Sequence, residues 1–253
     1  MTFPSTLARA WAVCTVCIAA WVQAAWAAPL PSSLSIDATA AVDTTNSSST
    51  GTASSTADTS KLLGGVASTP SPFTTAIFTS TGDAIRGAYV LKGGPGDAET
   101  ARFIDFSFAL ANTSATDTYE LDFAFLAELN ATASGGNAFS LNDLSVRDAA
   151  NNEVFFAFAN ADTANTINNG SGQGTTNPFS IVLAPGANTS FTALLRHYGG
   201  SSGNDGQYGA DASLSILLQD VRVAGGPIPV PTPVTLALVL LALPLLGITR
   251  RAR

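Results

Sequence analysis

The chain has 253 residues, 46% of them hydrophobic and only 11% charged, with a formal net charge of −7. All 18 acidic residues lie between Asp37 and Asp220, so the middle of the chain is strongly acidic. A surface of that sign repels polyanions, which excludes nucleic acid as a natural partner.

The first 27 residues are typical of a secretory signal peptide. Arg9 gives a weak positive region, residues 10–20 are apolar, and Ala25-Trp26-Ala27 fits a small-x-small cleavage site. The sequence therefore predicts that signal peptidase recognises Ala25 and Ala27 and that the mature chain starts at Ala28. A retained N-terminal anchor is the alternative.

Removal of this segment would also remove both cysteines, Cys14 and Cys17, so their C-x-x-C spacing is not expected to form a redox pair. The exported part would then hold one histidine and no thiol. Zinc sites normally take three or four nitrogen or sulfur ligands, so no zinc site and no cofactor are expected.

Residues 28–68 are dominated by Ser, Thr and Ala, with almost no large apolar side chain after Ile36. Such a segment buries too little apolar surface to offset its chain entropy. We therefore expect a disordered spacer, whose hydroxyl groups are potential sites of O-glycosylation.

Residues 69–225 are predicted to form one all-β domain. Large apolar side chains alternate with polar ones along 104–110 and again along 119–125, and the turn-forming residues 112–117 between them predict a hairpin. The irregular spacing of the strands favours an antiparallel β-sandwich, of jelly-roll or immunoglobulin-like kind, over a parallel β-helix. About nine strands are expected, the other seven at 73–79, 85–91, 139–146, 153–158, 179–184, 190–198 and 212–223.

Two sequence patterns resemble catalytic or metal-binding motifs without fitting them. Residues 199–203 spell G-x-S-x-G, but the Gly- and Asn-rich segment that follows cannot form the helix that a nucleophile elbow needs. His197, which shares a strand face with Phe191, is expected at the edge of the core. Calcium could find oxygen ligands in the loop Asn204, Asp205 and Asp211, or at Asp97 and Glu99, although turn formation explains both groups. No catalytic residue and no metal ligand is assigned.

Tyr198 and Tyr208 bracket the Gly-rich loop 199–207 and could offer a small stacking platform for a sugar. Together with Asp205 and Asp211 they form the predicted ligand loop. The alternative is two tyrosines that close a hairpin.

The C-terminal segment, residues 226–253, has three parts in a fixed order. A proline-spaced lead, Val230-Pro231-Thr232-Pro233, precedes an apolar run from Val234 to Ile248, and Arg250, Arg251 and Arg253 follow. A helix of about 15 residues rises roughly 22 Å, short of a hydrocarbon core about 30 Å thick. The run is therefore expected to form a marginal transmembrane helix, with the arginines holding the C-terminus on the cytoplasmic side.

This arrangement resembles the PEP-CTERM sorting signal of exopolysaccharide-producing Gram-negative bacteria, with Thr232 where that family most often has Glu. The resemblance implies an exosortase-like membrane protease as partner, with inner-membrane anchoring before processing. It also implies delivery to the outer surface or extracellular space. A plain tail anchor with a Pro-rich stalk is the alternative.

The resemblance further implies a structural or adhesive role in a biofilm or matrix, with exopolysaccharide as a partner, rather than an enzyme. A sugar- or calcium-binding module and a secreted hydrolase are the other functions considered.

Overall fold

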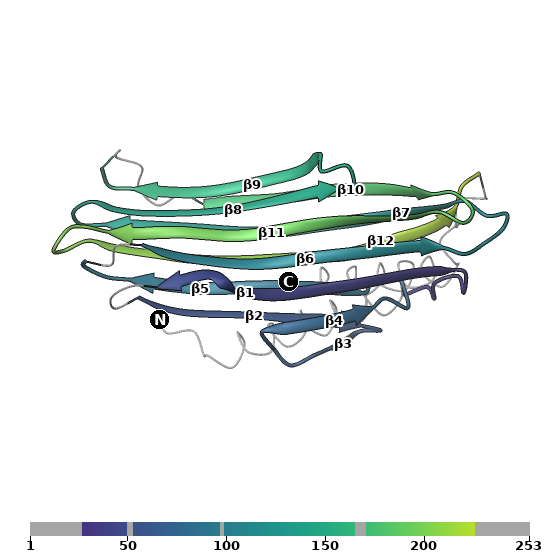
Figure 1. Ribbon diagram of the computed structural model, residues 1–253, viewed down its shortest axis with the longest axis horizontal. Coiled ribbons are helices and arrows are strands. Elements are labelled where there is room, and N and C mark those ends of the chain that lie inside the picture. The colour runs from purple at the N-terminus through teal and green to yellow at the C-terminus, as the bar shows by residue number, and fades with distance from the viewer. Residues whose placement is uncertain (1–26, 50–52, 97–98, 165–170, 226–253) are drawn as a thin grey trace, which may run out of the picture.

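Two antiparallel six-stranded sheets lie face to face, with their strands along the long axis of the molecule (Figure 1). The computed structural model describes residues 27–49, 53–96, 99–164 and 171–225. The first sheet has the strand order β4-β1-β6-β11-β8-β9 and the second β10-β7-β12-β5-β2-β3. The bounds are β1 Leu34–Ser49, β2 Ser54–Leu63, β3 Val66–Ala67, β4 Phe73–Ile77, β5 Ala84–Gly93, β6 Thr100–Asn112, β7 Tyr119–Ser134, β8 Ala138–Asp148, β9 Glu153–Asp162, β10 Ser171–Leu183, β11 Asn188–Ser201 and β12 Gln207–Val223.

The core is a layer of side chains between the two sheets. Along β6, Phe106 and Phe108 point inward while Asp105 and Ser107 are exposed, because successive side chains of a strand point to opposite faces. Aromatic rings from both sheets meet at the centre. Phe108 stacks on Phe191 with ring centroids 4.3 Å apart. The nine predicted strands are confirmed as β4 to β12.

The predicted disordered spacer is wrong for most of residues 28–68. β1 hydrogen-bonds to β4 on one side and to β6 on the other, and Ile36, Ala38 and Ala40 are buried in the core. The composition was misleading because small side chains fit between closely packed sheets, while the backbone ladder satisfies the polar main chain. The folded domain therefore includes the segment before residue 69.

The predicted hairpin between the segments at 104–110 and 119–125 is also wrong. β6 belongs to the first sheet and β7 to the second, so the chain between them arches from one sheet to the other. The Nδ2 group of Asn112 holds the arch, donating to the carbonyl oxygens of Asp117, Leu183 and Ala184 at 2.7, 3.1 and 3.0 Å. Turn-forming residues are compatible both with a hairpin within one sheet and with an arch between two sheets. The packing of the sheets decides which of the two forms.

Both predicted terminal segments lie outside the described residues, the signal peptide up to residue 26 and the transmembrane helix in 226–253. Within the described ranges no helix is long and apolar enough to cross a membrane.

Candidate functional site

The four residues of the predicted ligand loop are not brought together. Tyr198 lies on the outer face of the first sheet and Asp211 is exposed on the outer face of the second. Tyr208 points into the core, where its hydroxyl lies 2.7 Å from Thr100 Oγ1. Asp205 Oδ1 accepts a hydrogen bond from Gly136 N at 2.9 Å and so joins two loops. The tyrosine platform predicted from the sequence is therefore wrong.

The G-x-S-x-G sequence is not a nucleophile elbow. Ser201 is the last residue of β11, and its side chain and that of His197 both point into the core from the same strand. Residues four apart on a strand are separated by roughly 13 Å. Within the described chain, neither His197 Nε2 nor Ser201 Oγ has a hydrogen-bond partner. The glycines are explained by packing, since a Cβ at Gly199 would lie 2.7 Å from His197 Nε2.

His197 lies inside the core with 0% exposure, not at its edge as predicted. Its Nδ1 lies 2.8 Å from Asn142 Oδ1, and Asn142 Nδ2 donates to Asn130 O, which fixes the orientation of the amide. The Tyr89 hydroxyl is 3.0 Å from the same Oδ1. The ring therefore carries its proton on Nδ1. Burial lowers the pKa of His197 from 6.5 to about 3, so the ring is neutral at physiological pH.

Acidic side chains do not converge into a metal site in the part of the chain that the structure describes. No group of three or more His, Cys, Asp or Glu side chains lies close enough to hold an ion there. Asp97, from the second predicted calcium group, lies outside the described residues.

Exposed aromatic side chains gather on one sheet. Among the side chains that are described, the exposed phenylalanines Phe73, Phe139, Phe156 and Phe158 all belong to β4, β8 and β9 of the first sheet. The second sheet exposes aliphatic residues instead. Its outer face carries an open hollow of about 710 Å³, lined by Val90, Lys92, Asn130, Gln207 and Asp211 among others.

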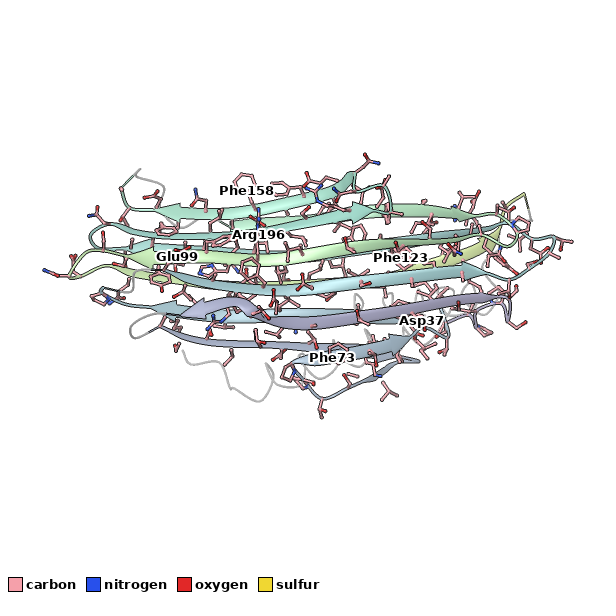
Figure 2. All side chains as sticks on the ribbon, in the orientation of Figure 1. Asp37, Phe73, Glu99, Phe123, Phe158 and Arg196 are labelled. Atoms are coloured by element: carbon pink, nitrogen blue, oxygen red, sulfur yellow. The ribbon has the colours of Figure 1, made fainter. Side chains whose placement is uncertain are left out.

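The most concentrated of these surfaces crosses four strands of the first sheet. Phe158 on β9 lies opposite Asp143 on β8, Asp143 opposite Arg196 on β11, and Arg196 opposite Phe103 on β6. Figure 2 labels Phe158 and Arg196 on this face. We call this surface the outer patch and define it as Phe103, Asp143, Phe156, Phe158, Arg196 and Tyr198.

Aromatic rings contact each other at both ends of the outer patch. On β9, Phe156 and Phe158 are 47% and 59% exposed, with ring centroids 5.9 Å apart. At the other end, Tyr198 and Phe103 meet edge to face at 5.5 Å. A sequence signal for the patch exists in Val154 to Phe158, because apolar residues there occupy both faces of the strand and one face must be exposed.

An ion pair lies in the middle of the outer patch. Arg196 Nε donates to Asp143 Oδ1, and the Arg196 guanidinium carbon lies 5.8 Å from the Tyr198 ring centroid. Burial raises the pKa of Asp143, but the hydrogen bond from Arg196 opposes that rise. The same hydrogen bond raises the pKa of Arg196, and we infer that the pair stays charged near neutral pH. The Arg196 side chain is still 40% exposed and can meet a ligand.

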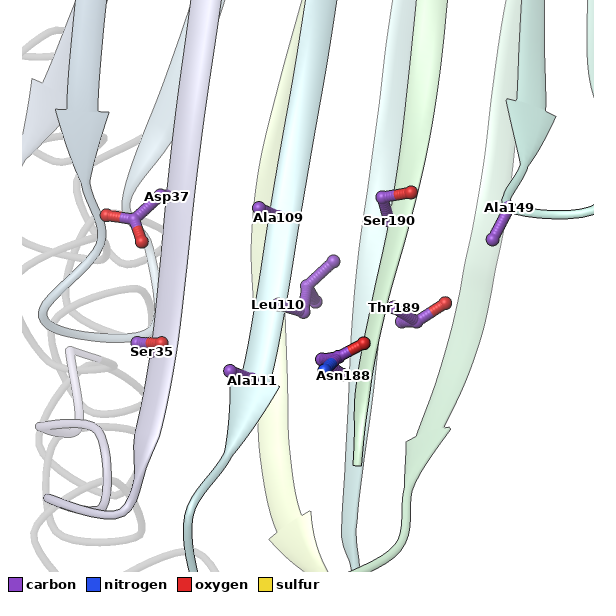
Figure 3. A pocket seen from close by; sticks show the side chains of 9 residues that line it. All are labelled: Ser35, Asp37, Ala109, Leu110, Ala111, Ala149, Asn188, Thr189 and Ser190. Carbon is purple, nitrogen blue, oxygen red and sulfur yellow. The ribbon is translucent and has the colours of Figure 1, made fainter. Parts of the chain in front are cut away.

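A shallow hollow of about 410 Å³ lies further along the same outer face (Figure 3). Ala109 and Ala111 of β6 form its floor, with Asp37 of β1 on one side and Asn188 and Ser190 of β11 on the other. Ser190 and Arg196 are six residues apart on β11, which corresponds to roughly 20 Å. The face thus offers aromatic rings at one place and hydroxyl, amide and carboxylate groups at another.

Comparison with known proteins gives no family. No family model matches the chain, and no curated protein matches it. The chain shares 14% identity with tailspike protein 4 of bacteriophage CBA120 over 72% of its length, at a TM-score of 0.20. It shares 12% identity with the structure of the infectious bursal disease virus Gx strain over 76% of its length, at a TM-score of 0.23. It shares 12% identity with a CocE/NonD family hydrolase from Staphylococcus aureus over 49% of its length, at a TM-score of 0.19. The chain spans only 19%, 58% and 33% of those three chains.

Proposed function

We propose that this chain is an exported, surface-sorted protein with a non-catalytic, adhesive role in an extracellular polysaccharide matrix. Signal peptidase would release it after Ala27, and an exosortase-like membrane protease would read Pro231 and Pro233 and process the tail. The outer patch is the surface through which it would contact polysaccharide. Aromatic rings give apolar faces on which sugar rings can stack, and the Arg196 guanidinium, oriented by the buried Asp143, offers hydrogen-bond donors beside them.

The observation that best supports export is where the folded domain starts. Ala28, the first residue after the proposed cleavage site, is already joined to the sandwich. Its N donates to Thr81 Oγ1 at 2.9 Å, and its carbonyl oxygen accepts from Thr81 N at 2.9 Å. Cleavage after Ala27 would leave the domain complete, with a new amino group at a position that donates a hydrogen bond.

The other end supports the same proposal. β12 ends at Val223, and Ala224 N donates to Thr118 O at 2.8 Å, three residues before Pro227, the first proline of the C-terminal segment. Along β6, Phe103 is nine residues from Asn112 at that same end of the sandwich, which corresponds to roughly 30 Å. A tail anchored in a membrane would therefore leave the domain at the end far from the outer patch.

Processing gives the first test. Replacing Pro231 and Pro233 by alanine in the native host should leave the uncleaved chain in the membrane fraction, because the protease would lose its recognition residues. Immunoblotting of membrane and released fractions measures this, and replacing Pro227 and Pro229 by alanine is the matched control. Equal release of all three forms would contradict sorting by the Pro-x-Pro signature.

Polysaccharide binding gives the second test. The variant Phe156→Ala/Phe158→Ala should bind the host exopolysaccharide at least about tenfold more weakly in a co-sedimentation assay, because both exposed stacking faces are lost. Phe73→Ala removes a similarly exposed ring at the opposite edge of the sheet and should bind like the wild type. Undiminished binding by the double variant would exclude the outer patch as the contact surface.

A further inference from the structure

In the part of the chain that the structure describes, β9 is an open sheet edge, and its stretch from Phe155 to Asp162 lacks the features that usually keep edges from pairing. Of the other edge strands, β3 has two residues, β4 has five and follows Pro72, and β10 has a register shift next to Pro178, which has no N–H group. Short strands, prolines and bulges all protect sheet edges. β9 is ten residues long and has no proline and no basic residue; a register shift at Val154 interrupts its first residues, but it pairs regularly with β8 from Phe155 to Asp162.

The hydrogen-bond pattern shows which backbone groups face outward from this edge. Thr163 N donates to Ala138 O at 2.9 Å, just beyond the last β8–β9 pair. In an antiparallel ladder hydrogen-bonded and non-hydrogen-bonded pairs alternate. From Phe155 to Asp162 the odd-numbered residues of β9 therefore hydrogen-bond to β8, and the N–H and C=O groups of Phe156 and Phe158 point to the open edge.

We propose that β9 pairs antiparallel with β9 of a second copy of this chain, about a two-fold axis at Ala157. The two first sheets would then form one continuous sheet. Phe156 would lie opposite Phe158 of the second copy, in a hydrogen-bonded pair, and Ala157 opposite Ala157. Four exposed phenylalanines would meet on the outer face as cross-strand aromatic pairs, which stabilise sheets.

The charges along β9 favour this antiparallel arrangement over a parallel in-register one. In the antiparallel arrangement Glu153 and Asp162 lie at opposite ends of β9, so Glu153 does not face Glu153 of the second copy and Asp162 does not face Asp162. A parallel in-register pair would place Glu153 beside Glu153 and Asp162 beside Asp162, which is destabilising. Glu153 is also partly neutralised by Arg147, at 3.6 Å.

The contact is small. Within the regular part of β9, Phe156 and Phe158 would form two pairs with about four backbone hydrogen bonds. A single strand edge covers less than the roughly 1,600 Å² of a standard interface, so we expect a dissociation constant of about 1 µM or weaker in solution. Chains held on one surface would pair more completely, because tethering raises their effective concentration. The pairing does not depend on the route of export or on polysaccharide binding.

Cysteine cross-linking tests the register. In the full-length chain with Cys14 and Cys17 replaced by alanine, Ala157→Cys should give a disulfide-linked dimer on mild oxidation in detergent. Residues in a non-hydrogen-bonded pair have Cα atoms about 4.5 Å apart, within the range that a disulfide needs. Thr192→Cys, exposed on the central strand β11, is the matched control and should stay largely monomeric. Equal cross-linking of both variants, or none at Ala157→Cys, would overturn the proposal.

A charge variant tests the edge without cross-linking. The apparent mass of the full-length chain in sedimentation velocity should rise towards that of a dimer with concentration. Phe156→Lys/Phe158→Lys should remain monomeric, because lysines would face lysines across the two-fold axis. Both positions are exposed, so thermal melting should show that the variant folds. Association that persists in the variant would mean that the apolar tail or another surface drives it, and would refute pairing through β9.

Discussion

Replacing Phe108 with alanine is expected to lower the free energy of unfolding by about 3–5 kcal/mol. Phe108 is fully buried, stacks on Phe191 at 4.3 Å and meets Phe78 and Phe123 edge to face, both at 5.9 Å. The alanine would leave a cavity bounded by strands of both sheets, which can collapse only in part. Urea unfolding followed by circular dichroism measures the loss.

The control for this substitution is Phe73→Ala on β4. Phe73 is 60% exposed, so removing its ring should change stability by only about 0.5 kcal/mol. If Phe108→Ala proved as mild as Phe73→Ala, the two sheets could not be packed through the aromatic layer described above.

Acid is expected to destabilise the domain through His197. Its folded-state pKa of about 3 lies below the ordinary 6.5, so between these values the unfolded chain binds a proton that the folded chain does not. Stability must therefore fall as the pH drops below about 6.5. At 1.36 kcal/mol per pH unit, roughly 2–3 kcal/mol should be lost between pH 7 and pH 4.5, in addition to changes from carboxyl groups.

His197 is the only histidine in the chain, so its titration can be followed without assignment. Nuclear magnetic resonance of the folded protein should show a neutral ring, with its proton on Nδ1, down to about pH 4. His197→Asn should show a shallower loss of stability between pH 7 and pH 4.5 than the wild type. A pKa near 6.5 in the folded state would contradict the buried position of the ring.

The sequence predicted strands well because alternation is a local property. β6 and β7 could be read from Phe106, Phe108, Phe123 and the polar residues between them. Neither the partner of each strand nor the arch at Asn112 could be predicted, because turn residues favour hairpins and arches alike. β1 was missed because alanine and threonine carry little signal on their own, although Ile36, Ala38 and Ala40 follow the same alternation.

The surface features were harder to predict than the fold. Tyr198 and Tyr208 are near each other in sequence, but one faces outward from β11 and the other inward from β12. The outer patch joins residues from β6, β8, β9 and β11, so its members meet only through strand order and register. Phe156 and Phe158 could have been recognised, because β9 has apolar residues on both faces and only one face can enter the core.

Mass spectrometry of the protein recovered from the native cell surface tests the proposed export and sorting most directly. The account predicts a mature chain that begins at Ala28 and ends close to Pro231 and Pro233, without the segment from Val234 to Arg253. Recovery of the chain from the cytosol, with residues 1–27 and 226–253 both intact, would contradict it.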